Sequence, residues 1–163
     1  MDAFAADWLK RHRNDSAFLF TLAGWAIEDK DYELAASRLE QSLRVAPDSA
    51  AALNNLAWVR AAQRKPGAVA LAERANALAP NQPPFLDTLA FALAAEGNVA
   101  RALEVQKKAL ELSPAAHGLR LNLARFYLDA GDKTAARREL DTLSGLGSTF
   151  NQQAEVETLR ARL

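Results

Sequence analysis

The sequence contains no cysteine, and this absence removes several kinds of chemistry at once. None of the 163 residues can form a disulfide, act as a thiolate nucleophile or bind zinc through sulfur. Only two histidines are present, His12 and His117. Without cysteine, the sequence does not indicate whether the protein works in an oxidising or a reducing compartment.

The sequence also lacks an excess of either charge and any long apolar run. Twenty basic residues balance twenty acidic ones, so no net field attracts the chain to nucleic acid or to anionic lipid. The first residues carry charges too early, and too short an apolar run, for a signal peptide or a membrane span. We therefore expect no nucleic-acid partner and no direct membrane insertion of this segment.

What the sequence does contain is an internal repeat of about 34 residues. Two series of residues return at steps of 33 or 34, and we call the members of the first series the repeat leucines. The one missing residue falls in the interval that holds QRKPG, which is typical of a turn. The two series are Leu22, Leu56, Leu89 and Leu123, and Ala35, Ala68, Ala102 and Ala136.

Within each repeat, apolar residues recur at spacings of three and four, which predicts two amphipathic helices joined by a turn. In the third repeat Leu89 and Leu93 belong to the first stripe, and Ala102 and Ala109 to the second. Pro114 closes this repeat. Each repeat is therefore predicted to be a helical hairpin.

These residues resemble the tetratricopeptide repeat. Leu86, Leu89, Ala90 and Leu93 stand at the family's Trp, Leu, Gly and Tyr places, and Gln106 stands at its aromatic place. The resemblance implies an all-α, right-handed superhelix of four hairpins with a leading and a C-terminal capping helix. The implied segments are a leading helix at 2–13, repeats at 16–49, 50–82, 83–116 and 117–148, and a capping helix at 150–163.

A narrower resemblance involves the stretches LNNLAWVRAA and GDKTAARRELDTL. They are similar to the C-terminal part of the repeat lipoproteins that accompany PEP-CTERM exosortase systems in bacteria. That resemblance implies a fragment of a longer protein in the bacterial envelope or periplasm, engaged in exopolysaccharide or surface-protein export. A cytoplasmic location is the alternative.

No pattern of catalytic, metal-binding or cofactor-binding residues is present. The acidic pair Asp29 and Asp31 falls in a hairpin turn, where carboxylates cap the following helix. The serines at the repeat boundaries are typical of helix starts, where short polar side chains are favoured. We therefore expect no enzyme activity, no metal and no cofactor.

The first helices of such hairpins line a concave groove, which is the usual binding surface of a helical solenoid. Counting from the repeat leucines predicts which side chains face it, and Trp58 and Phe91 alternatively fill the core. Asp87 and the lack of a groove lysine disfavour the family's clamp for chaperone carboxylates. The predicted groove residues are Phe20, Asn54, Asn55, Trp58, Asp87, Phe91, Asn122 and Arg125.

Three functions follow from this reading. The first is a scaffold that binds a peptide or protein segment in the groove, where Trp58 and Phe91 would hold apolar groups. The second is a structural spacer that assembles through its end faces and convex side, and the third is a carbohydrate-binding module. If the chain is a fragment, Trp8 in the leading helix is expected to be exposed and to promote a homodimer, whereas Trp25 is predicted to be a packing residue.

Overall fold

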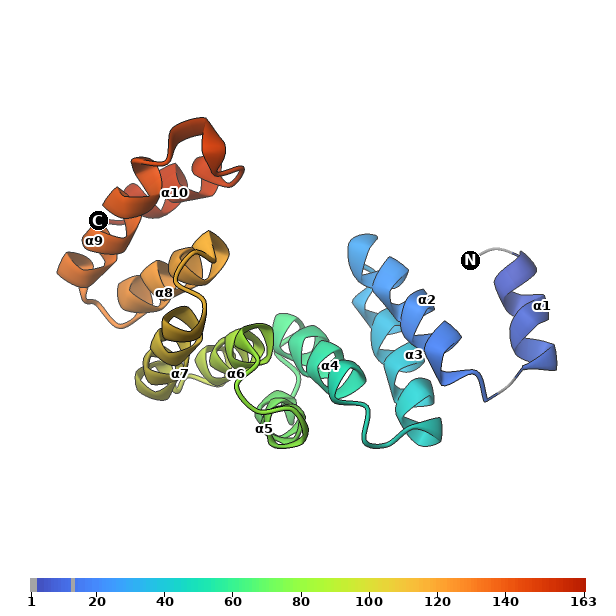
Figure 1. Ribbon diagram of the computed structural model, residues 1–163. Helices are drawn as coiled ribbons and strands as arrows, with labels where there is room; N and C mark the ends of the chain where they lie inside the picture. The colour runs from blue at the N-terminus through green and yellow to red at the C-terminus, as the bar shows by residue number, and fades with distance from the viewer. Residues whose placement is uncertain (1–2, 13) are drawn as a thin grey trace. The chain divides into compact units, whose positions relative to one another are not determined.

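The computed structural model of the protein describes residues 3–12 and 14–163, and within these the fold is entirely helical. Figure 1 shows the helices following one another as antiparallel pairs. The helices are α1 (Ala3–Arg11), α2 (Ser16–Glu28), α3 (Tyr32–Val45), α4 (Ala50–Ala62), α5 (Ala68–Leu78), α6 (Pro83–Ala95), α7 (Val99–Leu112), α8 (His117–Asp129), α9 (Lys133–Ser144), the short 3-10 helix η1 (Gly147–Thr149) and α10 (Gln153–Arg160).

The chain divides into two compact units, the first ending at Ala79 and the second beginning at Pro80. In the first unit, α2 pairs with α3 and α4 pairs with α5, while α3 packs against α4. One core cluster of this unit consists mainly of alanines, with Leu39, Leu56 and Val59 as its larger members. Small side chains let the helix backbones approach closely, so the packing is dense without bulky residues.

In the second unit, α6 pairs with α7 and α8 pairs with α9, and α10 packs on both α8 and α9. Phe150, Val156 and Leu159 from the C-terminal segment join Leu121 and Leu140 in one apolar cluster. Helix α10 therefore covers the apolar face that the last hairpin would otherwise expose.

The turns inside the four hairpins share one geometry. The residue that closes the first helix has a positive φ in each hairpin: Lys30 at 60°, Arg64 at 53°, Gly97 at 85° and Gly131 at 80°. The following residue donates its backbone N–H to a carbonyl five residues earlier, as Asn98 does to Leu93. The deletion in the second repeat therefore lies after this turn, between Lys65 and Ala68.

Short polar side chains begin many of the helices, as the sequence indicates for its turn residues. The Asp31 carboxylate accepts the N–H of Leu34, and the Asp132 carboxylate accepts the N–H of Ala135. Each bond satisfies a helix N–H that has no partner inside the helix.

The predicted hairpins, the leading helix and the capping helix are confirmed, while the handedness of a superhelix stays a prediction. Asp2 and Arg13, which bound the predicted leading segment, lie outside the described residues. Trp8 is less exposed than expected, while the homodimer stays a prediction. Its ring stacks on His12 and packs against Phe18, and its indole N–H donates to Asp15 at 3.0 Å, so the side chain is half-buried.

Candidate functional site

The predicted groove residues of the first unit lie partly in its core. Trp58 and Phe20 are half-buried and pack against the core cluster, and the Tyr32 ring meets Trp58 edge-on at 5.7 Å between centroids. Trp58 thus contributes to packing and keeps part of its surface accessible. The sequence left two alternatives for Trp58, a core residue and a groove residue. One part of the side chain packs in the core and another part remains accessible.

The two asparagines of α4 differ in accessibility. Asn54 is 8% exposed, and its amide nitrogen donates to Asn55 Oδ1 at 3.4 Å. The Asn54 Oδ1 atom is buried and accepts no hydrogen bond from the described residues. Asn55 is half-buried, so it is the more accessible of the two amides.

In the second unit, three predicted groove residues belong to one hydrogen-bonded network. Asp87 on α6 accepts two hydrogen bonds at the same carboxylate oxygen. Gln106 on α7 donates at 2.6 Å and Asn122 on α8 donates at 2.8 Å. Gln106 also donates to the Leu119 carbonyl at 2.9 Å. The carboxylate therefore ties three helices together.

The network continues from Asn122 to the C-terminal helix. Arg125 Nη1 donates to Asn122 Oδ1 at 2.9 Å, and Arg125 Nη2 forms an ion pair with Glu155 on α10. A carboxylate is the natural complement of a guanidinium, and in the structure the chain supplies that carboxylate itself.

Burial is the main influence on the ionisation of Asp87. It raises the pKa of the carboxyl above its ordinary value because the anion loses contact with water. Hydrogen bonds from Asn122 and Gln106, and then the charge of Arg125, oppose the shift. The network therefore holds an anion that would be more stable in water.

Sequence reasoning missed Gln106, which it treated only as a substitute at the family's aromatic place. Its side chain is fully buried, and its Oε1 atom has no hydrogen-bond partner in the described part of the chain. The available signal was a polar residue on the apolar stripe of a helix, because such a residue needs partners from other helices.

Phe91, the remaining predicted groove residue, lies on α6 and is half-buried.

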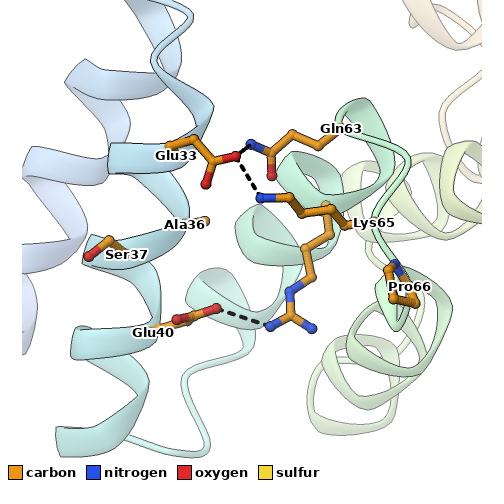
Figure 2. Close-up of a pocket in the computed structure, with 8 residues that line it drawn as sticks. Glu33, Ala36, Ser37, Glu40, Gln63, Lys65 and Pro66 are labelled. Atoms are coloured by element: carbon orange, nitrogen blue, oxygen red, sulfur yellow. Dashed lines mark hydrogen bonds and ion pairs between the residues drawn. The ribbon is translucent and has the colours of Figure 1, made fainter.

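A second polar arrangement joins α3 to the turn between α4 and α5 in the first unit. Glu33 accepts hydrogen bonds from Lys65 Nζ at 2.6 Å and from Gln63 Nε2 at 3.0 Å, and Arg60 pairs with Glu40 at 3.0 Å. Figure 2 shows Glu33 facing Gln63 and Lys65 across a hollow whose lining includes Ala36. Because each carboxylate has a cation within the chain, we treat this hollow as a contact between hairpins.

Nothing in the described part of the chain forms a metal centre or a membrane span. Across residues 3–12 and 14–163, no group of three acidic, histidine or cysteine side chains could hold a metal ion. Over the same residues, no helix combines the length and the apolar character that crossing a bilayer requires.

Comparison with protein families matches residues 93–163 to the model described as "Tetratricopeptide repeat". This stretch, somewhat less than half of the chain, is similar to the tetratricopeptide repeat family. The resemblance found in the sequence is confirmed over this part of the chain, and the earlier hairpins have the same turn geometry. Comparison with curated protein sequences finds no match.

Solved structures with this fold include a thermophilic TPR protein of Thermus thermophilus, with a TM-score of 0.80 and 16% identity over 96% of this chain and 87% of that one. The Pseudomonas aeruginosa pilF structure has a TM-score of 0.72 and 21% identity, covering 98% of this chain and 72% of its own. An O-GlcNAc transferase variant of Thermobaculum terrenum has a TM-score of 0.64 and 27% identity over 78% of this chain. This chain spans only 23% of the transferase's length.

Tetratricopeptide repeats typically form non-catalytic scaffolds that bind other proteins. The fold therefore supports a general role in protein–protein interaction.

Proposed function

We propose that this repeat protein is a non-catalytic scaffold that binds an extended protein segment along its first helices. The proposal rests on one aromatic residue on a first helix of each unit, Trp58 on α4 in the first unit and Phe91 on α6 in the second. Each is the second residue after a repeat leucine, and each is half-buried. Partly accessible aromatic rings bind apolar groups with little loss of side-chain entropy, so they suit a peptide-binding surface.

The resemblance to exosortase-associated lipoproteins supports a more specific proposal. In it, the bound segment belongs to a component of exopolysaccharide or surface-protein export in the bacterial envelope. Fractionation of the native host tests this location, because recovery of the chain only in the cytosol would contradict it.

The binding proposal is tested by affinity capture with the full chain and a Trp58→Ala/Phe91→Ala variant. We expect the variant to lose a partner that the unaltered chain retains, while its far-UV circular dichroism stays helical. The matched control is Leu78→Ala/Leu112→Ala, which removes two apolar side chains that are 44% and 46% exposed on second helices. Equal capture by all three proteins would refute the proposal.

Because Trp58 also packs in the core, a milder pair separates binding from folding. Trp58→Phe with Phe91→Leu keeps apolar volume at both places, so helicity and unfolding midpoint should change little. If this pair binds normally and the alanine pair is unfolded, both residues belong to the core. A structural spacer is then the better description.

A further inference from the structure

Trp25 is exposed at a place in the repeat that is otherwise buried. It is the third residue after the repeat leucine Leu22, and its side chain is 53% exposed, so the prediction that it packs is wrong. The residues at the same place in the other hairpins are Val59, Ala92 and Phe126, with exposures of 0%, 0% and 2%. Since this place belongs to a helix face that is normally covered, Trp25 marks a face of α2 that the described residues leave partly uncovered.

The indole borders a hollow of mixed character, which we call the Trp25 hollow. Its apolar lining consists of the buried Ala5 on α1 and of Leu22, Ala26 and Leu34 on the first hairpin, and its polar lining consists of Asp29 and Asp31. An exposed indole face beside carboxylates is the environment that a lysine or arginine side chain prefers.

The two carboxylates are not neutralised within the described residues. Asp31 uses one oxygen to cap α3 by accepting the N–H of Leu34, and no ion pair from residues 3–12 or 14–163 reaches either aspartate. Lys30 lies between them in sequence but forms no ion pair with them in the part of the chain that is described. The hollow therefore presents uncompensated negative charge next to an uncovered ring.

The turn between α4 and α5, the next hairpin turn of the first unit, shows which kind of group pairs with these turn positions. Gln63 and Lys65 hold the places after Leu56 that Asp29 and Asp31 hold after Leu22. They bind Glu33, a carboxylate on the helix that covers α4 (Figure 2). At the Trp25 hollow the turn is acidic instead of basic, so the complementary group on a covering helix is a cation.

We propose that the Trp25 hollow is a docking site for a helix of another protein that inserts a lysine or arginine side chain between Trp25, Asp29 and Asp31. The apolar face of that helix covers the indole, and its cation pairs with the two carboxylates. This contact is separate from the aromatic pair of the proposed peptide surface. It would let the protein hold one partner at its first hairpin and another along its first helices.

The test uses the full chain with ¹⁵N-labelled indoles and N-acetyl-arginine methylamide as the probe. We expect the Trp25 indole signal to shift saturably, while the signals of Trp8 and Trp58 stay in place. The citrulline analogue, which is an uncharged isostere, is expected to produce no saturable shift. No saturable shift with the arginine probe, or equal shifts with both probes, would overturn the proposal.

Two carboxylate variants show which groups bind the cation. Asp29→Asn and Asp31→Asn remove charge, and asparagine still caps α3, so folding should be retained. Each is expected to weaken binding of the probe about threefold, the usual scale for an exposed ion pair. The matched control Asp7→Asn, which neutralises an exposed carboxylate on α1, is expected to leave the affinity unchanged. Unchanged affinity in both turn variants would contradict the proposal.

Sedimentation of the unaltered chain and of Trp25→Ala distinguishes a different protein from a second copy. The proposal expects both to be monomers. A dimer that dissociates in the Trp25→Ala variant would identify the occupant as another copy of this chain, and the proposed heterologous partner would be wrong. Retained partner capture by Trp25→Ala would show that this site and the proposed peptide surface act independently.

Discussion

The hydrogen bond between Gln106 and Asp87 can be measured as a coupling free energy. The perturbation is leucine at each position, singly and together. Either single substitution leaves a polar group of the network with one partner fewer, whereas the double substitution removes both groups. We therefore expect the two single losses of stability to add up to more than the loss in the double variant.

The magnitude follows from the nature of the bond. The Gln106 amide donates to a carboxylate at 2.6 Å, and Gln106 is fully buried. A hydrogen bond to a charged group contributes roughly 1.5–3 kcal/mol to stability. A coupling of about 2 kcal/mol is expected, which equals a factor of about thirty in the folding equilibrium constant.

The assay is urea unfolding of four proteins, followed by far-UV circular dichroism and by tryptophan fluorescence. All three tryptophans, at positions 8, 25 and 58, lie in the first unit, so fluorescence reports that unit and circular dichroism reports both. Transitions that differ between the two probes are fitted separately, because a two-state analysis requires coincidence.

A matched cycle pairs Asp87→Leu with Glu104→Leu, since Glu104 is exposed on the same helix as Gln106. That cycle should be additive within about 0.5 kcal/mol. The same additivity in the Gln106–Asp87 cycle would refute the reasoning, because the bond would then contribute nothing specific to folding.

Two further predictions concern ionisation and backbone conformation. Because burial raises the pKa of Asp87 in the folded state, its contribution to stability is retained below the ordinary carboxyl pKa and lost as pH rises through the raised value. In urea unfolding, the Asp87→Asn variant should therefore gain stability relative to the unaltered chain as pH rises above the ordinary carboxyl pKa. A relative loss would mean that Arg125 and the hydrogen bonds outweigh burial. In the hairpin turns, Gly97→Ala at φ 85° should cost about 1 kcal/mol, whereas Lys30→Gly at φ 60° should gain about 0.5–1 kcal/mol. Thermal unfolding of both variants checks this pair, and effects of the same sign would contradict it.

The hairpins could be predicted because their signal is local and repeated. A leucine or an alanine that returns at a fixed step identifies a helix face four times over, so one atypical unit does not hide the pattern. The turn geometry could be predicted for only two of the four hairpins. Gly97 and Gly131 indicate a residue with positive φ, whereas Lys30 and Arg64 do not. The structure places all four in the same conformation, since the backbone pattern of the turn outweighs the penalty of a side chain there.

The polar network could not be predicted because its members are distant in sequence. Asp87 and Gln106 are separated by 19 residues, and Asp87 and Asn122 by 35. Counting from a repeat leucine indicates the direction of a side chain, but it does not identify the residue on the next helix that meets it. The exposure of Trp25 was missed for a related reason, since periodicity identifies a face without showing what covers it.

Whether a side chain already has a partner within the chain also affects which ligands each unit can bind. In the second unit, Asp87, Asn122 and Arg125 already bind one another, and Glu155 completes the pairing of Arg125. A ligand that used these groups would have to replace bonds that the chain makes with itself, which reduces the net gain on binding. At the first hairpin, Asp29 has no such internal competitor among the described residues, and half of the Trp25 surface is in water. A cationic partner therefore gains more from the Trp25 hollow than an anionic one gains from Arg125, although Arg125 is the more conspicuous residue in the sequence.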